Sequence, residues 1–232
     1  MLNQSSQSPT SSREIRPHYL LELVSDELVS AEAGHAPHWV RDQIEQTPFV
    51  VVRRACTSVG ELENMIPVGV RGQERSQRFA AFVSRHQVKR IIAPYELLGA
   101  LPSASNRELG VFAALTTLRN IWHELSSPWG PGGSVGFELA TAKKTTHSAS
   151  DLDIVIYSDK PLPIEQVRFL GSSLANLDVR VDVQVEAPSC AFLLAEYARD
   201  YPGEIILRTL SGPMLGVNPW QNSINPWRTV SI

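Results

Sequence analysis

The chain has 232 residues, of which 43% are hydrophobic, enough to bury a sizeable core in one large domain or two small ones. Its formal net charge of −3 lacks the strongly basic balance of a general nucleic-acid binder. No apolar run approaches the ~20 residues needed to cross a bilayer. The composition therefore argues against nucleic-acid and membrane proteins and predicts a globular, cytoplasmic protein.

The first 14 residues, MLNQSSQSPTSSRE, are rich in Ser, Gln and Pro and contain no apolar segment. A segment of this composition buries too little apolar surface to pack, so we expect a disordered leader over residues 1–14. Only two cysteines occur, Cys56 and Cys190, and neither has a partner at zinc-ligand spacing. Both are expected to be buried thiols.

Residues 15–102 are predicted to form a first, smaller α+β lobe. A helix is expected near residues 39–46, followed by β-rich runs at 48–55 and 66–72. Residues 73–86 are expected to form an amphipathic helix, because Phe79, Phe82 and Val83 have helical spacing. The segment VKRIIAPYELL then ends this lobe near Pro102.

Residues 103–232 are predicted to form a second domain, an α/β layer with a mixed sheet. It opens with a helix over 107–125, which has Val111 and Leu118 on one face and Ile121 beside it, and which ends at the loop SSPWGPGGS. The segments that follow alternate between apolar strand patterns and helix patterns. They are a strand at 151–157, a helix at 164–177, a strand at 179–185, a helix at 191–199 and a strand at 204–209.

Two aspartates open the first of these strands. Asp151 and Asp153 are two residues apart, so both carboxylates project from the same face of the strand. Like charges at this distance oppose each other's ionisation, and a hard divalent cation relieves the conflict. Magnesium bridges carboxylates to phosphates in this way, although a polar strand start produces the same pattern.

Two further features strengthen the interpretation as a site. The turn at Gly132, Gly133 and Ser134 lets the backbone approach a phosphate closely and adds a hydroxyl and an N–H. A third carboxylate, Asp182, lies within a later strand and needs a partner there. An ordinary loop and an ion pair with a neighbouring arginine are the alternatives for these two features.

A family resemblance connects these motifs. A Gly-Ser turn, a D-h-D strand and a third Asp on a later strand, over roughly residues 107–209, resemble the DNA polymerase β-like nucleotidyltransferase superfamily. More narrowly, the chain resembles the phosphoribosyl-dephospho-CoA transferases, the holo-acyl-carrier-protein synthases of malonate decarboxylase. The segments that carry this resemblance are GGSVGFELATAKKTTHSASDLDIVIY, VDVQVE, FLLAEYAR, ILRTLSGPML and NPW in the second domain, and RPHYLLEL, HWV, PFVVVRRA, IPVGVRGQERSQRFAAF and APYELL in the first lobe.

The resemblance implies a nucleotidyltransferase-like second domain and a reaction. The donor is triphosphoribosyl-dephospho-CoA, the acceptor is a serine of the apo acyl-carrier subunit of malonate decarboxylase, and pyrophosphate is released. Under this hypothesis, Asp151, Asp153 and Asp182 hold two Mg²⁺ ions, and Asp182 also accepts the serine proton. The expected substrate contacts are Gly133 and Ser134 in the turn and Arg71 and Arg75 in the first lobe. The arginines are included because their planar guanidinium groups suit phosphates.

Two alternatives stay open at this point. A nucleotidyltransferase that uses ATP or another triphosphate on a different acceptor would share the three aspartates. A catalytically inactive member of the fold would bind the carrier subunit as an adaptor. Donor screening separates the first from the reaction above, and magnesium titration separates the second.

Overall fold

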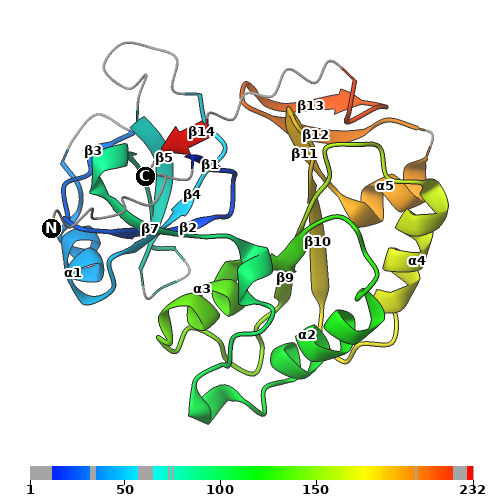
Figure 1. Cartoon of the computed structure of the whole chain (residues 1–232), viewed down its shortest axis with the longest axis horizontal. Helices are drawn as coiled ribbons and strands as arrows, with labels where there is room; N and C mark the ends of the chain where they lie inside the picture. Colours follow the sequence, from blue (N-terminus) through cyan, green and yellow to red (C-terminus); the bar gives the residue numbers. More distant parts are fainter. Residues whose placement is uncertain are drawn as a thin grey trace, which may run out of the picture.

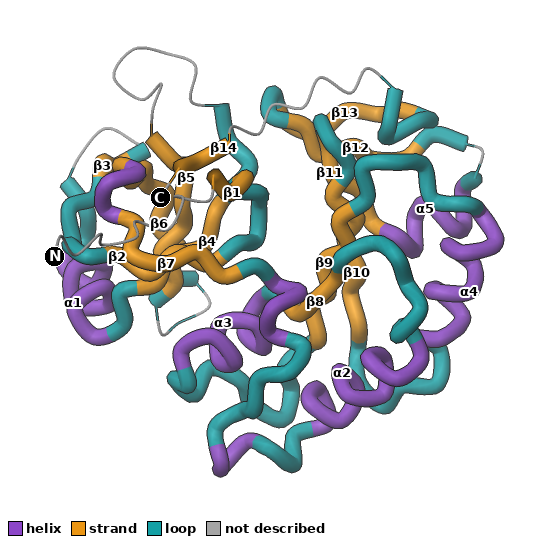
Figure 2. Tube along the Cα trace, viewed as in Figure 1, coloured by secondary structure: helices purple, strands orange, loops and turns teal. Residues whose placement is uncertain are grey.

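The computed structural model describes residues 12–31, 35–56, 65–72, 74, 76–201, 203–221 and 229–231. Over these residues the chain forms two lobes, each built on a six-stranded sheet (Figure 1). Helices gather on the second lobe, whereas the first lobe is mostly strand (Figure 2). The predicted class, an α+β fold with a mixed sheet in the second domain, is confirmed.

The first lobe contains an antiparallel sheet with the strand order β3-β6-β5-β4-β2-β7. Its longest strands form a hairpin, in which Ile66, Val68 and Val70 alternate inward with period two. The elements are β2 (Leu20–Leu23), β3 (Val29–Ser30), α1 (His38–Gln46), β4 (Phe49–Val52), β5 (Met65–Arg71), β6 (Arg78–Ser84) and β7 (Val88–Ile92).

The second lobe contains a mixed sheet with the order β13-β12-β11-β10-β9-β8. Only β9 and β10 pair in parallel, joined through α4, and the remaining pairs are antiparallel. The elements are α2 (Gly110–Ile121), β8 (Trp129–Pro131), α3 (Gly133–Thr141), β9 (Leu152–Tyr157), α4 (Ile164–Leu174), β10 (Val181–Glu186), β11 (Cys190–Leu193), α5 (Leu194–Asp200), β12 (Ile205–Thr209) and β13 (Gly212–Gly216).

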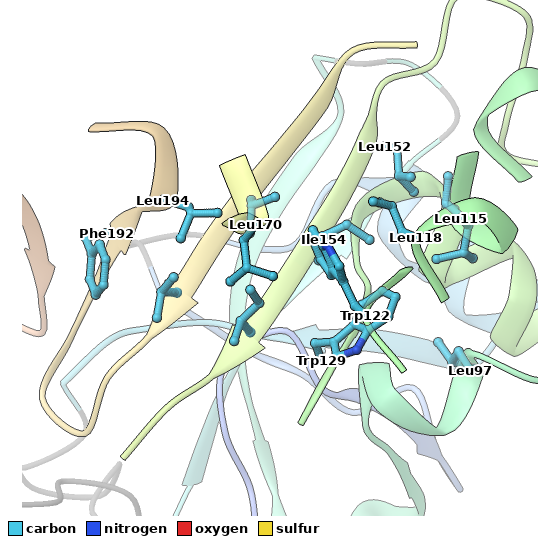
Figure 3. Packing of buried hydrophobic residues seen from close by; sticks show 14 of the residues in the cluster. Leu97, Leu115, Leu118, Trp122, Trp129, Leu152, Ile154, Leu170, Phe192 and Leu194 are labelled. Carbon is cyan, nitrogen blue, oxygen red and sulfur yellow. The ribbon is translucent and has the colours of Figure 1, made fainter. Parts of the chain in front are cut away.

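Both faces of the central strands in this sheet are covered. Leu152 and Ile154 pack with α2 and α4 in the larger core (Figure 3), and Ile156 belongs to the same core. Val155 and Tyr157 point the other way and pack into the core of the first lobe. Burial on both faces explains the apolar run that follows Asp153 in β9, and it fixes one face of the sheet against the first lobe.

The prediction of a helix over residues 73–86 is wrong. Residues 78–84 form strand β6, which pairs along its whole length with β5 and also contacts β3. Both sides of this inner strand are partly covered, so Phe82 is buried as well as Ala81 and Val83. Apolar residues on both faces of a strand imitate helical spacing over a short window.

Other boundaries differ from the prediction in smaller ways. Helix α2 ends at Ile121, whose side chain is exposed, instead of continuing to residue 125. The first part of the predicted helix 191–199 is strand β11, because it pairs with β10 and β12 before α5 begins. Cys190 is buried as expected, but Cys56 is exposed.

Two short strands from opposite ends of the chain pair with each other. Strand β1 (Ser12–Glu14) is antiparallel to β14 (Thr229–Ser231). Residues 12–14 of the leader predicted over residues 1–14 therefore form a strand, and its first 11 residues lie outside the described part of the chain. Within the described residues, no helix is long and apolar enough to cross a bilayer.

Candidate active site

Two of the three predicted aspartates face each other across neighbouring strands. In the parallel pairing of β9 with β10, Asp153 stands directly opposite Asp182. The same register continues with Val155 opposite Gln184 and Tyr157 opposite Glu186. These six residues share one face of the sheet because strand side chains alternate. It is the face that Val155 and Tyr157 pack against the first lobe.

The surroundings of Asp153 disfavour its ionised form. Burial by the surrounding protein raises its pKa, and the negative charges of Asp182 and Asp151 raise it further. The positive charges of Arg71 and His18 act in the opposite direction. Asp153 nonetheless keeps an accessible side. A desolvated carboxylate beside two others, and open to a ligand, fits a site that accepts a cation.

Helix α3 begins directly beside this carboxylate. Its first residue, Gly133, has a φ of 54°, and a Cβ added there would lie 1.8 Å from Asp153 Oδ2. Only glycine fits this position, for both conformational and steric reasons. The first turn of a helix presents N–H groups without acceptors inside the helix. An anion held beside Asp153 would therefore meet these donors.

A Gly133→Ala substitution tests this close approach. We expect the reaction that the family resemblance implies to slow about 100-fold, because the Asp153 carboxylate must move by a large fraction of an ångström or more. The strain of alanine at positive φ should cost only about 1–2 kcal/mol. Gly171→Ala is the matched control, since it lies inside α4 and its added Cβ has nothing within 4 Å beyond its chain neighbours and the backbone of its own helix. Equal activity of the two variants would contradict the proposed geometry.

A cavity of about 730 Å³ opens in front of the two aspartates. Asp153, Asp182 and Gly133 line it from the second lobe. Strands β2, β4, β5, β6 and β7 of the first lobe contribute the opposite wall, and part of that wall is apolar. The basic residues that line the cavity are His18, Arg53, Arg71, Arg78, Arg180 and Arg208.

The basic residues come from both lobes. Arg71 and Arg78 are direct partners at the end of the β5–β6 hairpin, so the pairing brings two positive charges to one rim. Arg208 reaches in from β12 and donates a hydrogen bond from Nη1 to Gln184 Oε1 at 2.6 Å. Such forks match phosphate geometry. A cavity with acidic groups on one wall and cations around them suits a polyphosphate with a metal ion.

Only some of the predicted substrate contacts lie at the cavity. Gly133 and Arg71 line the cavity, whereas Ser134 is buried in the first turn of α3 and is not part of the lining. Asp151 precedes β9, does not line the cavity, and acts on Asp153 through its charge. Arg75 lies outside the described residues.

The alternative contact of Asp182 is also present. Arg180 Nη2 lies 3.1 Å from Asp182 Oδ2, and both side chains are substantially exposed. Such exposed pairs contribute only about 0–1 kcal/mol, so the contact leaves Asp182 available to a ligand. Within the described ranges, no three His, Cys, Asp or Glu side chains are grouped closely enough to hold a metal ion by themselves.

Three residues of this region were not predicted. His18 and Arg208 line the cavity, and the fully buried Glu186 lies behind them. Nothing local to His18 in the sequence marks it, because its neighbours in the cavity come from distant segments. Glu186 did leave a signal, since it continues the period-two series of Asp182 and Gln184 along one strand face.

The site combines paired carboxylates at the starts of strands, a glycine at the start of the adjacent helix and arginines opposite them. This combination is typical of enzymes that transfer a phosphate-linked group.

Comparison with known proteins identifies the family. The N-terminal domain model of phosphoribosyl-dephospho-CoA transferase MdcG matches residues 16–94, and the C-terminal domain model matches residues 99–219. A phosphoribosyl-dephospho-CoA transferase of Klebsiella pneumoniae (strain 342) is 38% identical over 211 residues, covering 88% of this chain and 96% of the relative. One from Pseudomonas putida (strain GB-1) is 35% identical, covering 88% and 95%. No solved structure matches significantly. The chain therefore belongs to the phosphoribosyl-dephospho-CoA transferase family and is a transferase.

Proposed function

We propose that the protein transfers the phosphoribosyl-dephospho-CoA group from triphosphoribosyl-dephospho-CoA to a serine of the apo acyl-carrier subunit of malonate decarboxylase. A bond forms between the serine oxygen and the phosphorus nearest the ribose. The bond from that phosphorus to pyrophosphate breaks. One observation carries the proposal: Asp153 and Asp182 stand side by side in a cavity whose other polar lining is mainly arginine.

The acidic residues fit a magnesium ion, although they do not form a closed cage. Mg²⁺ in phosphoryl-transfer sites usually takes one or two carboxylates and completes its shell with water and substrate phosphate. The raised pKa of Asp153, caused by burial and by the neighbouring carboxylates, supports this, because Arg71 and His18 offset its ionised form only in part. In the proposal Asp153 and Asp182 would hold the metal, and Asp151 contributes through its negative charge. The metal supplies neutralisation of phosphate charge.

The protein's own groups perform the remaining tasks. Arg71 and Arg78 attract the triphosphate from the first lobe, and the N–H groups at the start of α3 approach it from the second. The apolar part of the cavity wall excludes water from the reacting phosphate. The serine hydroxyl proton passes to the Asp182 carboxylate. Positioning and charge neutralisation thus account for the catalysis.

Mass spectrometry of the carrier tests the proposal. We expect purified protein, Mg²⁺ and triphosphoribosyl-dephospho-CoA to increase the mass of the apo carrier subunit by one prosthetic group, with release of pyrophosphate. Replacement of the carrier's acceptor serine by alanine should abolish the gain. ATP in place of the donor tests the rival nucleotidyltransferase. A carrier that gains mass from ATP but not from triphosphoribosyl-dephospho-CoA would refute the assignment.

A further inference from the structure

A charged side chain is completely buried between the two lobes. Glu186, the last residue of β10, has no exposed surface. Its Oε1 accepts hydrogen bonds from His18 Nε2 at 3.1 Å and from Gln184 Nε2 at 2.8 Å. Its Oε2 accepts a hydrogen bond from Arg54. Burial raises the pKa of Glu186, but the bond from His18 and the positive charges of His18 and Arg54 lower it more, so the carboxylate is ionised.

This arrangement is a poor way to stabilise a fold. Removing a carboxylate and its partners from water costs several kcal/mol, and apolar packing of equal volume often stabilises as well or better. The interface also has an apolar alternative at hand, since Tyr157 and Val155 already pack there. The role of Glu186 therefore lies in the groups that it orients.

His18 is the oriented group that reaches the cavity. It lies just before β2 in the first lobe, with an unusual φ of 71°, and its backbone N–H is held by Val52 O at 3.0 Å. Non-glycine residues at positive φ are uncommon and occur at functional sites where surrounding structure maintains them. The imidazole lines the cavity together with Asp153 and Asp182. Its charge also acts directly on Asp153.

The orienting contact uses one nitrogen of the ring. Nε2 donates to Glu186 Oε1 at 3.1 Å, so it cannot also accept from Gln184 Nε2, which lies 2.7 Å from it, and Glu186 is the partner that orients the imidazole. Among the residues that the structure describes, the second nitrogen, Nδ1, has no hydrogen-bond partner. A carboxylate that fixes one imidazole nitrogen leaves the other with a defined direction and protonation. Gln184 is fixed in turn by Arg208, which also lines the cavity.

We infer that His18 binds the polyphosphate of the donor, and that Glu186 is a positioning residue which acts through it. The inference rests on the proposed function, because a triphosphate ester is the ligand class that this function brings to the cavity. It adds a first-lobe contact that pairs with the carboxylates across the cavity. A donor substrate that contacts both lobes would hold the two lobes at a fixed distance and orientation while its phosphorus reacts.

Binding of inorganic tripolyphosphate with Mg²⁺, measured by isothermal titration calorimetry, tests the inference without the carrier. His18→Asn should weaken binding about tenfold, since one hydrogen bond to a charged group is lost. Asparagine tolerates positive φ, so the substitution removes the imidazole with little backbone strain. The control is His123→Asn, because His123 is exposed at the end of α2. Equal affinities of His18→Asn and wild type would overturn the inference, whatever the transfer assay gives.

The positioning role needs a second measurement. Glu186→Gln keeps the shape of the side chain and removes its charge, and we expect it to weaken tripolyphosphate binding in the presence of His18. In the His18→Asn background the same change should add almost no further loss, because the two residues act as one unit. Fully additive losses would show that Glu186 does not act through His18. Kinetics of His18→Asn should show a higher KM for the donor and an unchanged KM for the carrier.

Discussion

Asp153→Asn is expected to abolish transfer while leaving the fold intact or more stable. The substitution removes the carboxylate that faces Asp182 and the cavity. Loss of several kcal/mol of charge stabilisation corresponds to about 10²–10⁴-fold in kcat. The folded state disfavours the ionised form of Asp153, since burial and two neighbouring carboxylates raise its pKa. Neutralising it should therefore keep or raise the melting temperature near neutral pH.

Two measurements make this prediction specific. Mg²⁺ with tripolyphosphate should raise the melting temperature of wild type and should have almost no effect on Asp153→Asn. Asp178→Asn is the control, because Asp178 is exposed and does not line the cavity. A folded Asp153→Asn variant with near-normal transfer would disprove the assignment of Asp153. A marked fall in its melting temperature would show that Asp153 has a structural role instead.

The fold was predictable where local pattern and tertiary environment agree. The strand that contains Asp153 and the helix at α4 were located because apolar periodicity, turns and chain order all favoured the same element. The helix predicted at β6 is wrong because the strands that pair with it, β3 and β5, lie outside the local window. Helix α3 was missed because its glycine-rich start looks like a loop until Asp153 is placed beside it.

The site was predictable to the extent that its residues share a strand pattern. The acidic pair follows from two strand motifs, and their parallel register supplied the contact. His18 comes from the first lobe and Arg208 from β12, a more distant strand of the same sheet as the aspartates, so only the tertiary fold brings them to the cavity. Ser134 had the expected motif but the wrong environment, since the first turn of α3 buries it. Motif spacing gives residue types, whereas tertiary packing decides which of them reach the cavity.

Glu138 is a buried carboxylate of the opposite kind to Asp153. It lies on α3 with no exposed surface, and its Oε2 accepts bonds from Asn106 Nδ2, from the N–H groups of Thr145 and Thr146, and from Thr146 Oγ1. Its Oε1 accepts a hydrogen bond from Ser103. Burial raises its pKa, but these bonds outweigh burial and lower the pKa from 4.5 to about 2. The ionised group therefore stabilises the fold and ties the loop before Asp151 to α3.

We expect Glu138→Gln to unfold more easily while the folded enzyme stays active. Because the folded pKa lies below the unfolded one, this stabilisation is complete above pH 4.5 and is lost as the pH falls toward 2. The shift corresponds to on the order of 3 kcal/mol, or roughly 6–12 °C in melting temperature. The free energy of unfolding of wild type, measured with urea, should fall steeply as the pH decreases through that acidic window. Glu138→Gln should show a smaller dependence on pH.

The exposed Glu108 supplies the control, since Glu108→Gln should match wild type at every pH. Parallel acid curves for wild type and Glu138→Gln would contradict the role of Glu138. The contrast between Glu138 and Asp153 is physical. Glu138 accepts hydrogen bonds that stabilise its charge, so it contributes to stability. Asp153 faces other negative charges, and its own charge is compensated only when a ligand brings a cation. Neutral substitutions at the two positions should therefore change stability in opposite directions, and only the one at Asp153 should remove activity.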